Sequence, residues 1–90
     1  MSDLLLPGAE LIEAGLADLR NDAETDESLL VSMAAPRLRA LGFDVPTPLA
    51  DPELRLYRRL AARHGAAAHA RYNALVRHLV SFQRAAACVR

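Results

Sequence analysis

The chain has 90 residues, of which 52% are hydrophobic and only 4% aromatic, and its formal charge is zero because 11 arginines balance 11 acidic residues. Such a length gives one small domain that buries about 60 to 65% of its unfolded surface. No apolar run approaches a membrane span, no signal peptide begins the sequence, and the single Cys88 excludes an internal disulfide. We therefore expect a cytoplasmic protein without a membrane segment.

Helix formers dominate the composition, with 18 alanines and 16 leucines, so an all-α fold is expected. Pro7 suits the first turn of a helix that covers about 7–20. A second helix is expected over about 25–41, capped by Asp22 or Thr25 and stopped by Gly42. Pro36 inside it predicts a kink or break nearby, because proline removes a backbone hydrogen bond.

Residues 42–51 form a linker, because Pro46 and Pro48 lie within it and Pro52 follows directly, and Phe43, Val45 and Leu49 should anchor it against the core. Asp51, Pro52 and Glu53 then predict the start of a third helix, with the Asp51 side chain as its cap. Apolar positions continue at spacings of three and four straight through Gly65. This phase favours one long helix over about 52–87. The alternative is a bend or split at Gly65, which would give four helices.

The second half of that helix carries a wide apolar arc. Its members are the candidate interface residues Tyr72, Leu75, Val76, Leu79, Val80, Phe82 and Gln83. A long helix with so wide an arc is difficult to cover with two short helices of the same chain. We therefore expect a small helical bundle of three helices that is completed by homodimerisation, with an unidentified second protein as the other possible partner.

Charge is distributed unevenly along the chain. Residues 1–50 hold nine acids against three arginines, a net charge of −6, and residues 51–90 hold eight arginines against two acids, a net charge of +6. The candidate nucleic-acid contacts form a basic stripe on the third helix: Arg55, Arg59, Arg63, Arg77 and Arg84. Because the two halves should neutralise each other, we expect weak or no binding of nucleic acid.

The three histidines, His64, His69 and His78, are spaced by five and nine residues, which does not place metal ligands on one face of a helix. His64 falls in the apolar stripe and is interpreted as a core or interface residue. Arg71 and His78, with six residues between them, resemble the Arg-x(4–6)-His signature of HEPN ribonucleases. The resemblance covers eight residues, implies cleavage of RNA across a dimer, and departs from the signature where Tyr72 replaces the usual polar residue.

No glycine-rich phosphate loop, nucleophile elbow or ligand cluster is present in the sequence. We therefore assign no catalytic residue, metal or cofactor and expect a non-enzymatic, self-associating interaction, scaffold or regulatory protein. A nucleic-acid-binding protein is the alternative, and a HEPN-like ribonuclease ranks third.

Overall fold

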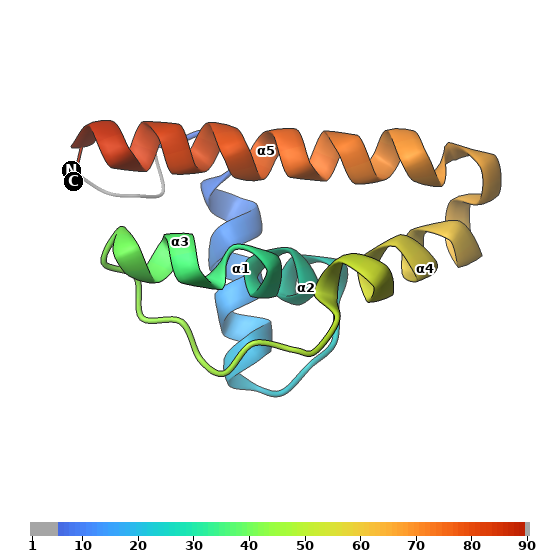
Figure 1. Ribbon diagram of the computed structural model, residues 1–90, viewed down its shortest axis with the longest axis horizontal. Helices are drawn as coiled ribbons and strands as arrows, with labels where there is room; N and C mark the ends of the chain where they lie inside the picture. Colours follow the sequence, from blue (N-terminus) through green and yellow to red (C-terminus); the bar gives the residue numbers. More distant parts are fainter. Residues whose placement is uncertain (1–5, 90) are drawn as a thin grey trace.

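The computed structural model describes residues 6–89, and every regular element in that range is helical, as expected for an all-α fold. The helices are α1 (Ala9–Arg20), α2 (Asp26–Met33), α3 (Ala35–Ala40), α4 (Pro52–His64) and α5 (Ala68–Val89), and a 3-10 turn at Gly65–Ala67 joins the last two. Figure 1 shows α5 along one side of the molecule, with α1 running nearly perpendicular to it and α2, α3 and α4 beneath.

The turn between α1 and α2 separates the two roles that the sequence left open for Asp22 and Thr25. Asp22, at φ 55°, follows the end of α1. Its N–H donates to the Leu19 carbonyl, and the Ala23 N–H donates to the Asp18 carbonyl. Thr25 begins α2. Its Oγ1 accepts from the Ser28 N–H at 3.0 Å, and its own N–H donates to Ser28 Oγ at 2.8 Å. This reciprocal pair is a capping box, with serine in the place of the usual glutamate or glutamine.

The expected second helix is broken at Ala34, within the region that Pro36 predicted, and continues as α3. Gly42 then ends α3 at φ 98°, with its N–H on the Arg39 carbonyl and the following N–H on the Leu38 carbonyl. A residue with positive φ at this place is what the αL termination of a helix requires.

The linker lies against the core, as its apolar residues predicted. Val45 is buried, and Phe43 and Leu49 are partly buried against the core. Arg39 and Ser32 hold the linker in place. Arg39 Nη2 donates to the Val45 carbonyl at 3.0 Å and to the Pro46 carbonyl at 3.2 Å, and Ser32 Oγ accepts from the Leu49 N–H at 3.0 Å. At the end of the linker, Asp51 is the residue before α4. Its side chain makes no cap hydrogen bond, because its backbone is left-handed at φ 48°. The predicted capping role of Asp51 is therefore wrong.

The favoured continuous helix over 52–87 is also wrong, and the alternative split at Gly65 is observed. Gly65 has φ 54° and ψ −120°, a conformation open to glycine and strained for L residues. The chain reverses there, so α5 packs along α4 as an antiparallel hairpin (Figure 1). On α4 the buried residues are Leu56 and Leu60, whereas Tyr57 and Ala61, which hold the apolar spacing through Gly65 in the sequence, are exposed.

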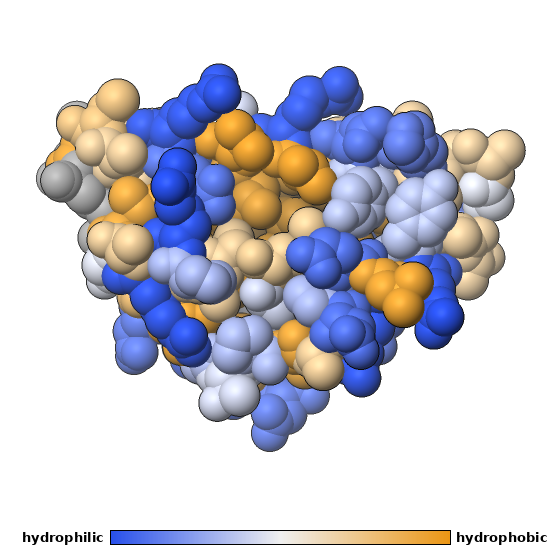
Figure 2. All heavy atoms as spheres, viewed as in Figure 1, coloured by the Kyte–Doolittle hydropathy of each residue, from blue (hydrophilic) through white to orange (hydrophobic). Residues whose placement is uncertain are grey.

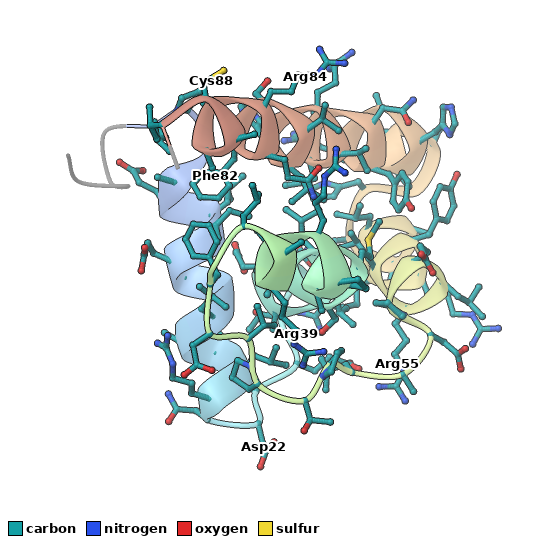
Figure 3. The ribbon with its side chains drawn as sticks, turned by 60° about the vertical axis from the view of Figure 1, so that its left-hand side comes forward. Asp22, Arg39, Arg55, Phe82, Arg84 and Cys88 are labelled. Carbon is teal, nitrogen blue, oxygen red and sulfur yellow. The ribbon has the colours of Figure 1, made fainter. Side chains whose placement is uncertain are left out.

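The core lies where α5 closes over the other helices. From α5 it takes Ala68, Leu79, Phe82 and Ala86, and the Phe82 ring lies 5.5 Å from that of Phe43. Figure 3 shows Phe82 pointing from α5 into the body of the molecule. Close approach of α1 and α2 depends on the buried Gly15, where a Cβ atom would stand 2.9 Å from the Glu27 carbonyl carbon. The core is therefore built mainly from leucine and alanine side chains, together with the buried Phe82.

Candidate functional site

An open hollow of about 260 Å³ lies where the N-terminus of α2 meets the α4–α5 hairpin. We call it the arginine–histidine hollow. Its charged and imidazole side chains are Asp26, Arg63, His64, Arg71 and His78, and its apolar lining is Leu60, Ala74 and Leu75. The reversal at Gly65 creates this site, because it brings the end of α4 beside the first turns of α5.

Ion pairs between α2 and α4 organise one wall of the hollow. Arg59 Nε donates to Asp26 Oδ1 at 3.0 Å, and Arg63 Nη2 donates to Asp26 Oδ2. The Asp26 side chain is only 15% exposed, so solvent screens these contacts less than it screens most surface pairs. Glu24 binds Arg55 at 3.1 Å and Arg59 at 3.8 Å. One carboxylate, Asp26, therefore fixes Arg63 at the edge of the hollow.

The other polar side chains of the hollow have no such partner. Within residues 6–89, neither Arg71, His64 nor His78 makes an ion pair or a hydrogen bond. Two guanidinium groups and one carboxylate give the lining a net charge of +1 with neutral imidazoles. Both histidines are able to donate hydrogen bonds as well. The hollow is therefore a concave surface rich in donors and positive charge.

His64 does not belong to the core, which was one of the two places that the sequence interpretation gave it, and its interface role stays a prediction. It is half-buried and lines the hollow, because α4 ends there and the chain turns away. His69 is exposed and lies outside the hollow. Among residues 6–89, no group of three or more histidine, cysteine, aspartate or glutamate side chains is placed to hold a metal ion.

The predicted basic stripe is divided by the hairpin. Its α4 members, Arg55, Arg59 and Arg63, face the acids of the α1–α2 turn and the start of α2 and are ion-paired. Its α5 members, Arg77 and Arg84, are exposed. Figure 3 shows Arg55 and Arg84 on opposite sides of the molecule. The structure thus does not bring the five arginines to one surface.

The predicted interface residues of α5 also divide into two groups. Leu79 and Phe82, at 6% and 1% exposure, belong to the core of this chain. The remaining five are half-buried: Tyr72, Leu75, Val76, Val80 and Gln83. Leu75 lines the hollow, whereas Tyr72, Val76 and Val80 lie on the other flank of α5, given about 100° of rotation per residue. The single long helix that favoured dimerisation is not observed, and α4 covers part of α5.

Two residues of α4, which the sequence had not placed with the interface, extend this flank. Leu54 is 51% exposed and Tyr57 is 39% exposed, and the Tyr57 ring lies 5.7 Å from that of Tyr72. Burial of the Tyr72 side chain, and secondly the negative charge of Glu53, raise the pKa of its hydroxyl. Figure 2 shows apolar surface below α5 and again over α4 on this side of the molecule. We call Leu54, Tyr57, Tyr72, Val76 and Val80 the apolar face.

No protein-family model, no curated protein and no solved structure matches this chain. Across residues 6–89, no helix combines the length and apolar character needed to cross a bilayer. The apolar face and the arginine–histidine hollow are the two surface features of the described residues that bear on function.

Proposed function

We propose that this chain is a non-enzymatic, self-associating interaction protein of the cytoplasm, and that two copies meet through the apolar face. The observation that carries the proposal is the row of apolar side chains left partly or largely exposed on one side of the hairpin. The exposed Tyr57 lies beside the half-buried Tyr72, and the exposed Leu54 lies about one helical turn before Tyr57 on α4. Aromatic and aliphatic residues gathered in this way are typical of the centre of a protein interface.

Charge at the two ends of the apolar face favours a second copy as the occupant. Glu53 lies close enough to Tyr72 to influence its hydroxyl, while the exposed Arg84 lies about 18 Å further along α5, at 1.5 Å per residue. A two-fold axis between Val76 and Val80 would set Val76 of one copy against Val80 of the other. The same rotation brings the Glu53 end of each copy to the Arg84 end of its partner, as a self-complementary dimer interface requires.

The two other candidate functions rank below this one. Binding of nucleic acid would depend mainly on Arg77 and Arg84, since the three α4 arginines of the stripe are paired with Glu24 and Asp26. Ribonuclease activity would use Arg71 and His78, which line the same hollow. Neither alternative explains the apolar face.

The test is the oligomeric state of the Val76→Asp variant. We expect light scattering at about 100 µM to give a mass near twice 9.8 kDa for the wild type. A dimer predominates when the protein concentration exceeds its dissociation constant. Val76→Asp should give a monomer, because the dimer would bury an unpaired carboxylate. Circular dichroism should show that the variant keeps the wild-type helix content, since Val76 is not part of the core.

Ser81→Asp is the matched control, because it adds the same charge to an exposed position on the opposite side of α5. It should leave the dimer intact. A monomeric wild type at every concentration would overturn the proposal. So would equal disruption by Ser81→Asp, since the apolar face would then not be the contact.

A further inference from the structure

We propose that the arginine–histidine hollow binds the phosphate group of a small molecule. The site combines Arg63 and His64 from the end of α4 with Arg71 and His78 from the first three turns of α5. Nothing in the helical packing requires this combination: within residues 6–89, Arg71 and both histidines make no polar contact, and none of them belongs to the core. The proposal is independent of self-association, because the hollow and the apolar face lie on opposite flanks of α5.

Charge supports an anion as the ligand. Among residues 6–89, Asp26 is the only acid in the lining, and its two carboxylate oxygens already bind Arg59 and Arg63. Its negative charge is thereby shared between two guanidinium groups and does not neutralise Arg71. A bound anion would pair with Arg71, as the carboxylates of Glu24 and Asp26 pair with Arg55, Arg59 and Arg63.

The number and geometry of the donors favour phosphate over carboxylate. Arg71 presents a planar set of N–H groups that fits two oxygens of a phosphate, and each imidazole supplies a further donor. A carboxylate has only two oxygens and would leave part of this set unused, whereas a phosphate monoester has three terminal oxygens. Donors that arrive from two helices around a concave surface also suit a tetrahedral group better than a planar one.

The apolar part of the lining indicates what carries the phosphate. Leu60 is buried beneath the site, and Ala74 and Leu75 are half-buried on the α5 side. These residues offer contact for carbon atoms next to the phosphate but no polar group for a sugar or a base. A volume of about 260 Å³ accommodates a phosphate with a small organic group. Free phosphate would use only the polar part of the same site.

The experiment is a titration of the full chain followed by amide shifts in ¹H–¹⁵N NMR spectra, at constant ionic strength maintained with chloride. The probes are inorganic phosphate and phenyl phosphate. We expect saturable shifts at residues lining the hollow, and weaker binding by about tenfold in Arg71→Ala, as for loss of a charge-assisted contact. Tighter binding of phenyl phosphate would identify an ester as the ligand, and equal binding would identify free phosphate.

Two matched controls separate a built site from general positive charge. Arg84→Ala removes an arginine that points away from the body on the same helix (Figure 3), and should change the affinity less than twofold. His69→Gln should likewise have little effect, whereas His78→Gln should weaken binding severalfold. Arg71 is exposed and unpaired, so its removal leaves the fold intact, which melting curves will verify.

Three results would overturn the proposal. The first is the absence of saturable shifts with either probe beyond those caused by chloride. The second is an equal loss of affinity in Arg84→Ala and Arg71→Ala, which would indicate diffuse attraction. The third is tighter binding in the hollow by a short single-stranded RNA than by phenyl phosphate, if Arg71→Ala removes the RNA binding. The ligand would then be a nucleic acid and not a small molecule.

Discussion

Replacement of Gly65 by alanine tests the reversal on which the whole hairpin depends. Gly65 sits between α4 and α5 at φ 54° and ψ −120°. A Cβ atom built at this position meets no other atom within 4 Å, so the change creates no clash in the folded state. The effect on stability therefore reports the backbone conformation alone.

The expected effect is a loss of stability. Holding an L residue in a sparsely populated φ/ψ region costs about 1 to 3 kcal/mol. Alanine also restricts the unfolded chain, which returns about 0.4 to 1 kcal/mol. The free energy of unfolding should fall by about 1 to 2 kcal/mol, which corresponds to a decrease in melting temperature of about 5 to 15 °C for a domain of this size.

Thermal unfolding followed by circular dichroism at several low concentrations provides the measurement. Comparison across concentrations separates the folding of one chain from any association. An increase in melting temperature by Gly65→Ala would refute the reasoning, because alanine is favoured over glycine by about 1 kcal/mol only inside a helix. That result would mean that α4 and α5 form one continuous helix in solution.

Two further substitutions test contacts that hold the helices together. Gly15→Ala should lower the free energy of unfolding by about 1 to 3 kcal/mol, because the Cβ atom of alanine would overlap the Glu27 carbonyl group. This loss should exceed the gain from the better helix propensity of alanine. Urea unfolding will measure the change, and an unchanged midpoint would mean that α1 and α2 pack less closely than described. Asp26→Asn should reduce stability by about 1 kcal/mol at low salt and less at 1 M salt, because it removes the partner of two arginines. Asp51→Asn is its control and should be close to neutral, since the Asp51 side chain makes no cap hydrogen bond; equal effects of the two changes would remove the special role of the Asp26 pairs.

Local chemistry in the sequence was sufficient for the helices and for most of their ends. Alanine and leucine content predicted the all-α class, Pro36 predicted the break that falls at Ala34, and Gly42 predicted the end of α3. The anchoring of the linker by Val45 also followed from sequence. These features depend on residues a few positions apart, so backbone sterics and short-range hydrogen bonds decide them.

The sequence failed at Gly65 because periodicity has no information about direction. Apolar residues recur at spacings of three and four on both sides of Gly65, so a straight helix and a hairpin have the same pattern in the sequence. Packing of α5 against α4 and α2 decides between them, through contacts between residues far apart in the chain.

The candidate site was likewise set by tertiary structure. Arg63 belonged to a predicted basic stripe, His64 to an apolar stripe, and Arg71 with His78 to a separate local resemblance. The hairpin brings all four to one hollow beside Asp26 and moves Arg77 and Arg84 to other surfaces. By itself, the sequence determined which residues could form helices and carry charge. Which of those charges pair, and which remain unpaired around a hollow, depended on the fold, because ion pairing acts over a few ångströms in space and not along the chain.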